Sequence, residues 1–319
     1  MAQDNSQVSW TDEQWARVNQ VIQEEASRAR VTASFLPLYG PLPASTDFVR
    51  DEAISYPALA QGQHRIAIAD TDTIKLPTLQ VKVYLRGAQM ADPEMTSVLA
   101  VFRRAANVLA RLEDAVIFNG QTAPGGDGKG AAKGALGDLP RIWEILGGQD
   151  NGGLLGPDST GPEPRTRPHV PIHLDGENDG RRLVAAVSDA IGKLEGKGHF
   201  GPFAVVLDQK FFLIAQTPDE DSLVLPQDRI IPFLGGGSLL RSSTLPENRG
   251  VVVALGGAAV ELVVATDMSV QFLQVTTDPM FVFRVFEKMA LRIKEREAIM
   301  ALTLGAHESH EEDRPTRRR

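Results

Sequence analysis

Apolar residues recur at helical spacing near the start of the chain. Trp15, Val18 and Ile22 stand three or four residues apart, and two alanines continue the series. This spacing places them on one face of a helix over residues 11–31. A threonine and a glutamine at its first and fourth positions form the sequence pattern of a capping box. We therefore predict an amphipathic helix whose apolar stripe lies on another surface.

Two further helical patterns follow. Asp92 is a capping residue, Pro93 can open a helix, and apolar residues then keep helical spacing until Gly120. About 26 residues at 1.5 Å each predict a helix of roughly 39 Å. The range 181–194 has the pattern of a shorter amphipathic helix.

Alternating and continuous apolar runs predict strands between and after these helices. The segment 35–43 contains three prolines and a glycine, so we expect it to be extended. Residues 47–78 are polar with short strand-like runs, which predicts a long two-stranded arm without a core of its own. An isolated hairpin is marginal in water, so the arm is expected to need a neighbouring copy. The predicted strands are 65–69, 79–85, 203–207, 251–255, 260–265, 270–275 and 281–302.

These elements are segregated along the chain, which indicates an α+β fold. A hydrophobic fraction of 42% and a charged fraction of 23% are those of a folded globular protein. The formal charge of -8 argues against a nucleic-acid-binding surface, and the absence of cysteine excludes disulfides and thiol catalysis. We find neither the pattern of a signal peptide nor a run of about 20 apolar residues, so a cytoplasmic protein without a membrane partner is expected.

Catalytic patterns are missing. The glycine-rich segment 125–134 lacks the lysine and hydroxyl residue of a phosphate-binding loop and is interpreted as a linker. His169 and His173 have metal-ligand spacing, but flanking prolines exclude the helix that would bring them together. Glu113 and Asp114 are adjacent, so they do not share a helical face as an acid and base pair. We therefore expect no enzyme activity, no cofactor and no metal site. An enzyme on an α+β fold stays open as an alternative.

Four segments, in the same order along the chain, resemble the shell proteins of encapsulin nanocompartments. The first is the amphipathic start with Trp15, followed by Tyr39-Gly40-Pro41-Leu42. The others are residues 112–120, the glycine-proline turn and strand over 198–207, and the closing segment 283–299. The resemblance covers most of the chain outside roughly 120–180.

This resemblance implies the fold of tailed-bacteriophage major capsid proteins (Hong Kong 97 type), with an extended arm, a peripheral domain and an apical domain. It further implies a bacterial family 1 shell that self-assembles with icosahedral symmetry. Such a shell would enclose a cargo enzyme bound through a C-terminal targeting peptide, for iron storage or oxidative-stress defence. The typical cargo is a ferritin-like protein or a dye-decolourising peroxidase. A phage or prophage capsid protein that packages DNA is the alternative within the same fold.

The resemblance also divides the chain into segments. They are 1–46, the lumen-facing helix with a peripheral-domain segment; 47–78, the arm; 79–120, the peripheral domain with its spine helix; 121–180, a Gly/Pro-rich insertion; 181–200, a peripheral-domain helix; 201–265, the apical domain; 266–304, closing peripheral-domain strands; and 305–319, a disordered charged tail.

Site residues come from the same resemblance. The groove for the targeting peptide would be lined by Trp15, Val18, Ile22, Phe35, Leu38, Met268, Val270 and Phe272, although each could equally be an ordinary core residue. Phe35→Asp is accordingly predicted to spare assembly and abolish cargo loading. Asp219, Glu220 and Asp221 would line a five-fold pore, or form a solvated acidic loop. The family's Arg-Arg pair and flavin-site tryptophan have no counterparts here, so we expect a more apolar tag and no flavin.

Overall fold

The computed structural model describes most of the chain, with gaps. The described residues are 8–58, 63–69, 71–121, 136–137, 139, 141–149, 151–156, 167–176, 178–219 and 223–305. The glycine-rich segment 125–134, the charged tail, and the acids Glu220 and Asp221 lie outside these residues.

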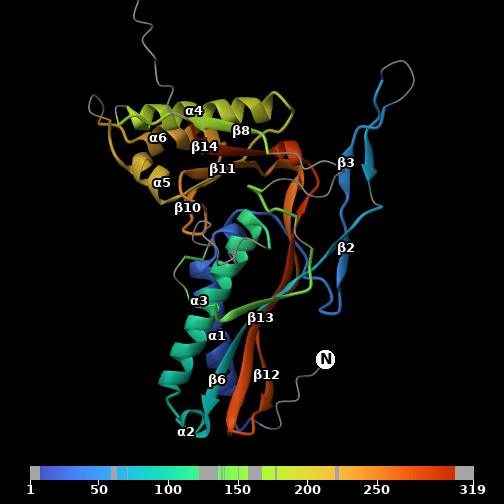
Figure 1. Ribbon diagram of the computed structural model, residues 1–319, viewed down its shortest axis with the longest axis vertical. Coiled ribbons are helices and arrows are strands. Elements are labelled where there is room, and N and C mark those ends of the chain that lie inside the picture. Colours follow the sequence, from blue (N-terminus) through green and yellow to red (C-terminus); the bar gives the residue numbers. More distant parts are fainter. Residues whose placement is uncertain are drawn as a thin grey trace, which may run out of the picture.

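The elongated lower lobe in Figure 1 is built on a five-stranded sheet. Its strand order is β1-β12-β13-β6-β7, with β12 and β13 forming a long antiparallel pair. β1 runs parallel to β12, and the remaining neighbours are antiparallel. The strands are β1 (Leu38–Tyr39), β6 (Thr78–Arg86), β7 (Trp143–Leu146), β12 (Val260–Val275) and β13 (Met280–Ile293).

Two long helices, α1 (Asp12–Ala29) and α3 (Thr96–Asn119), pack against each other and against this sheet. The predicted capping box of α1 is present, because Thr11 Oγ1 accepts from Gln14 N and Gln14 Oε1 accepts from Thr11 N. α3 begins later than predicted. Residues 92–95 form a turn, and Met95 adopts a left-handed conformation (φ 54°) directly before the helix. A short helix, α2 (Gly87–Met90), joins β6 to this turn.

The upper lobe contains a second five-stranded sheet, in the order β10-β9-β11-β14-β8. Every side chain of β9 is buried, as the continuous apolar run predicts. α4 (Asp179–Glu195) packs on β8, β11 and β14. The other elements are β8 (His169–Ile172), β9 (Phe203–Leu207), α5 (Gln209–Gln216), α6 (Pro226–Ile230), β10 (Leu239–Arg241), β11 (Arg249–Ala254) and β14 (Ile299–Leu304), with short 3-10 turns at Ile231–Leu234, Gly256–Ala258 and Arg296–Ala298.

A two-stranded arm extends beside both lobes in Figure 1. It contains two antiparallel pairs, β2 (Phe48–Arg50) with β5 (Thr73–Lys75) and β3 (Ala53–Ser55) with β4 (Ala67–Ala69). The arm is attached to the lower sheet by the buried Arg292 of β13. Arg292 Nη1 donates a hydrogen bond to the carbonyl oxygen of Arg50 on β2 (3.1 Å).

Strand connectivity differs from the expectation in three places. Residues 260–265 and 270–275 belong to one continuous strand, β12, so the expected domain boundary after residue 265 falls inside a strand. β14 pairs with β11 in the upper sheet and does not continue β13 in the lower one. The segment expected to be an insertion supplies β7 to the lower sheet and β8 to the upper one. Strand pairing between distant segments leaves no local sequence pattern, which explains these differences.

Candidate functional site

Four of the expected peptide-binding residues lie in the core. Val18 and Ile22 on α1 and Met268 and Val270 on β12 are 0–3% exposed. Gln23 Nε2 also donates to the Met268 carbonyl oxygen (2.7 Å), which ties the helix to the strand. These residues hold α1 on the sheet, so their apolar side chains are not available to a peptide in this conformation.

Trp15 and Phe272 lie at the edge of an aromatic cluster near the start of α1. Trp10 stacks on Phe283 with ring centroids 5.0 Å apart, and Trp15 meets Trp10 edge to face at 5.1 Å. Trp15 and Phe272 are each partly buried. Trp10 was not among the expected site residues, because it precedes the periodic part of the helix.

Phe35 and Leu38 differ in accessibility. Phe35 is 9% exposed and belongs to the core, whereas Leu38 on β1 is 63% exposed. Leu38 borders a cavity of about 200 Å³. Its apolar wall is formed by Ala33, Pro41, Leu262, Val264 and Met289.

The expected residues therefore do not form one groove. Trp15 and Phe272 lie near the first turn of α1, while the Leu38 cavity lies beside Arg30 at the end of this helix. Fifteen residues of helix separate them by about 22 Å, at 1.5 Å per residue. We name the second place the Leu38 cavity; it combines an exposed apolar side chain with a concave surface.

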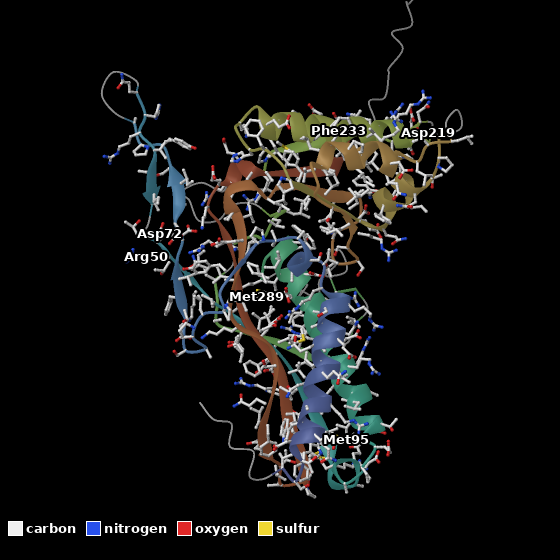
Figure 2. All side chains as sticks on the ribbon, turned by 180° about the vertical axis from the view of Figure 1, so that it is seen from behind. Arg50, Asp72, Met95, Asp219, Phe233 and Met289 are labelled. Carbon is white, nitrogen blue, oxygen red and sulfur yellow. The ribbon has the colours of Figure 1, made fainter. Side chains whose placement is uncertain are left out.

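A buried ionic cluster forms the polar wall of the Leu38 cavity. Arg30 Nε lies 2.6 Å from Glu113 Oε2, and Nη1 lies 2.8 Å from Asp267 Oδ1. Arg30 Nη2 forms an ion pair with Glu287 Oε2. Glu113 and Glu287 are each 1% exposed, so two carboxyl groups share one guanidinium away from water. Figure 2 places Met289, another cavity residue, beside the middle of the long strands.

The pKa values in this cluster reflect burial and charge. Burial raises the pKa of Glu113 well above its usual range, and the nearby charge of Glu287 raises it further. Burial also raises the pKa of Glu287, with Arg30 acting in the opposite direction. Burial lowers the pKa of Arg30, but Glu287, Glu113 and Asp267 together raise it by more. These effects favour a protonated Glu113 beside an ionised Arg30.

Asp114 has a structural role next to this cluster. It accepts hydrogen bonds from the N–H of Thr32 (2.8 Å), from its hydroxyl (2.7 Å) and from the N–H of Val31. Burial raises the pKa of Asp114 to about 6, although these hydrogen bonds lower it. Glu113 and Asp114 are thus both buried and bind different partners, the Arg30 guanidinium and the Thr32 N–H and hydroxyl groups. Arg30 and Glu287 were not predicted as part of the site, because these partners of Glu113 lie far away in the chain.

Asp219 does not fit the expected pore role. Its side chain is 4% exposed and faces Arg229 Nη1 (3.7 Å) and Arg181 Nε (3.9 Å). Figure 2 places it at the outer end of the upper lobe, and Gly180 at the start of α4 approaches it closely. An anion near a helix N-terminus is electrostatically favoured, so the start of α4 stabilises the Asp219 carboxylate. Glu220 and Asp221 lie outside the described residues.

The described ranges contain neither a group of His, Cys, Asp and Glu arranged to hold a metal ion nor a helix long and apolar enough to cross a membrane. His169 lies in β8 rather than in a loop, and both it and His173 are exposed.

Comparisons with known proteins identify the family. The sequence model named Linocin_M18, described as an encapsulating protein for peroxidase, matches residues 2–136 and 165–290. The chain belongs to this family. It is 28% identical to the type 1 encapsulin shell protein EncA of Myxococcus xanthus over 303 residues, covering 91% of this chain and 92% of that protein. It is also 22% identical to a diheme-cytochrome-encapsulin shell fusion protein of Kuenenia stuttgartiensis, covering 93% of this chain and 75% of that protein.

Solved structures confirm the capsid fold predicted for this encapsulin shell protein. A virus-like particle from Pyrococcus furiosus has a TM-score of 0.63 at 15% identity, covering 92% of this chain and all of that one. Gordonia phage Cozz has a TM-score of 0.54 at 11% identity, covering 86% of each chain. The fold is therefore that of Hong Kong 97-type capsid proteins, and the family makes the chain a shell protein of a capsid-like nanocompartment.

Proposed function

We propose that many copies of this protein assemble with icosahedral symmetry into a closed cytoplasmic shell that has no enzyme activity of its own. The arm carries this proposal. Ile66 and Ile68 on it are 77% and 65% exposed, and Phe48 and Tyr56 are more than half exposed. Apolar surface of this kind is stabilised when another copy covers it.

We further propose that the shell captures a cargo enzyme through a short peptide at the Leu38 cavity. Three features support this choice: Leu38 is exposed, the cavity wall beside it is apolar, and β1 lies at the edge of its sheet. An edge strand has free backbone groups that an extended peptide can pair with. The cargo we propose is a ferritin-like protein or a peroxidase, serving iron storage or oxidative-stress defence. The family model, described as an encapsulating protein for peroxidase, supports the peroxidase.

Assembly is tested by expressing the chain alone and examining it by size-exclusion chromatography and negative-stain electron microscopy. We expect uniform hollow particles. A discrete monomer or dimer would overturn the shell proposal. The ratio of absorbance at 260 and 280 nm tests the DNA-packaging alternative, because packaged DNA would raise it strongly.

Cargo capture is tested with Leu38→Asp in shells purified from the native host. Leu38 is exposed, so this change should leave folding and assembly intact while it removes the enclosed protein seen by gel electrophoresis and mass spectrometry. Phe35→Asp is unsuitable, because the structure buries Phe35 and a buried charge destabilises the fold.

Leu273→Asp on β12 is the matched control, since Leu273 is 39% exposed and lies roughly 36 Å along the strand from the cavity residue Leu262, at 3.3 Å per residue. Normal loading in Leu38→Asp shells would reject the Leu38 cavity, and lost loading only in Leu273→Asp shells would favour the aromatic end of α1.

A further inference from the structure

A cavity of about 500 Å³ lies on one face of the upper sheet, away from the Leu38 cavity. Its lining comes from β8, β11, β14 and the two loop residues Leu155 and Arg167. In register, His169 on β8 pairs with Ala301 on β14, and Arg249 on β11 pairs with Thr303 on β14. Residues two apart on a strand point to the same face, so these four side chains share one side of the sheet.

The charged side chains among the described residues of this lining are cationic. Arg167 and Arg249 contribute guanidinium groups and His169 an imidazole, while the other lining residues, Leu155, Ala301, Thr303 and Leu304, are uncharged. Arg249 and His169 are exposed, whereas Arg167 is only 7% exposed. The cavity thus joins an accessible guanidinium and an accessible imidazole to a buried guanidinium.

Arg167 has no acidic partner within the described part of the chain. Its Nη2 donates to the carbonyl oxygen of Gly153 (3.0 Å), and its buried Nε has no hydrogen-bond partner. Among the described residues, no carboxylate forms an ion pair with it, although Asp51 and Asp72 line another cavity that it borders. Burial lowers the pKa of Arg167 to about 10. Burying a cation without a counter-charge is costly, and a bound anion would offset that cost.

We propose that this cavity binds a small oxyanion of the phosphate class, held by Arg167 at its buried side and by Arg249 and His169 nearer to solvent. Arginine suits this role, because its planar guanidinium donates parallel hydrogen bonds to the oxygens of phosphate or carboxylate. The Thr303 hydroxyl, in the same lining, is a further hydrogen-bond donor for such an anion.

The test is equilibrium dialysis of the purified full-length protein against radiolabelled inorganic phosphate, at constant ionic strength set with chloride. We expect saturable binding of one phosphate per chain. Arg249→Gln removes one charge-assisted hydrogen-bond donor from an exposed position, so we expect affinity to fall about tenfold or more. Arg167→Met should weaken binding similarly, provided that circular dichroism shows a folded protein.

Arg103→Gln is the matched control, because Arg103 is exposed on α3 in the other lobe; it should bind phosphate as the unchanged protein does. Absence of saturable binding, or equal affinity in Arg249→Gln and the unchanged protein, would overturn the proposal.

A carboxylate of the chain could instead be the occupant. Asp158 and Glu163 stand close before Arg167 in the sequence, outside the described residues. If phosphate binds only after Asp158→Asn and Glu163→Gln are combined, the cavity holds the chain's own carboxylate and the proposed phosphate site is wrong. Equal binding with and without this double change supports the site.

Discussion

Arg30 links three carboxyl groups beside the Leu38 cavity, and its replacement is the most informative single change. Arg30→Met would leave Glu287 and Asp267 without this cation, and Glu287 is buried. Removing one partner from a buried ion pair typically costs about 3–5 kcal/mol. We therefore expect a large fall in the free energy of unfolding, measured by chemical denaturation of the unassembled chain.

Glu113→Gln is the matched comparison. Because burial and Glu287 already favour a protonated Glu113, an uncharged amide of nearly the same shape should change the free energy of unfolding by about 1 kcal/mol or less, the size of one net hydrogen bond. An equally large loss in both variants would show that Glu113 is ionised in the folded protein.

Asp114 should make the stability of the folded protein depend on pH. Its folded-state pKa of about 6 lies above the ordinary value of 3.8, so the unfolded chain releases this proton first as the pH rises. The contribution of Asp114 to stability is therefore complete below pH 4 and is lost as the pH rises through about 6. A shift of about two pKa units corresponds to roughly 3 kcal/mol.

Asp114→Asn cannot ionise, so its melting temperature relative to the unchanged protein should rise between pH 4 and pH 7. The exposed Asp12→Asn, in the first turn of α1, controls for the altered net charge. A difference that stays constant over this range for Asp114→Asn would contradict the raised pKa.

Local sequence patterns predicted the capping residues of α1 correctly, but they did not predict the partners of the buried charges. The Thr11 and Gln14 capping box is present because both partners lie within one turn. The hydrogen bond between Arg30 and Glu287 joins residues 257 positions apart, and Asp114 reaches Thr32 across 82 positions. No periodicity relates such residues, so the charged wall of the candidate site could not be predicted from the sequence alone.

The arm exposes apolar side chains that a monomer would leave in contact with water. We expect the combined change Ile66→Lys and Ile68→Lys to leave the far-ultraviolet circular dichroism unchanged, because both side chains are already exposed. Assembly should be lost or strongly reduced, since charges would replace apolar contacts with a neighbouring copy and interface energies concentrate in a few such residues. Size-exclusion chromatography measures the outcome.

Thr73→Lys, an exposed position on β5 in the same arm, serves as the control and should still assemble. Normal particles from the isoleucine variant would show that these side chains stay exposed in the assembly.

The apolar stripe of α1 illustrates what periodicity establishes about an element. The spacing of Val18 and Ile22 predicts a buried helix face, and both are buried. Periodicity does not say whether the covering surface belongs to the same chain or to a ligand. Here β12 and α3 of the same chain cover the stripe, which removes these residues from the list of accessible peptide contacts.

At the scale of the whole molecule, β14 connects the two lobes. The chain leaves the lower sheet at the end of β13 and, after one short turn, inserts β14 between β11 and β8 of the upper sheet. Apolar composition predicted a strand there, but not which sheet it would join, because both sheets offer apolar neighbours. The order of strands therefore had to come from the structure.

This central position predicts different results for two truncated chains. A chain ending at Gly305 keeps every element of both sheets and should assemble. A chain ending at Ala298 loses β14, including the buried Ile299, Met300 and Leu302. Burial of each such side chain contributes about 1.5–3 kcal/mol, and their sum approaches the whole stability of an ordinary domain. The upper lobe should then fail to fold, so the shorter chain should accumulate as insoluble aggregate. Soluble yield and electron microscopy distinguish the two; particles from the chain ending at Ala298 would mean that β14 is dispensable to the shell.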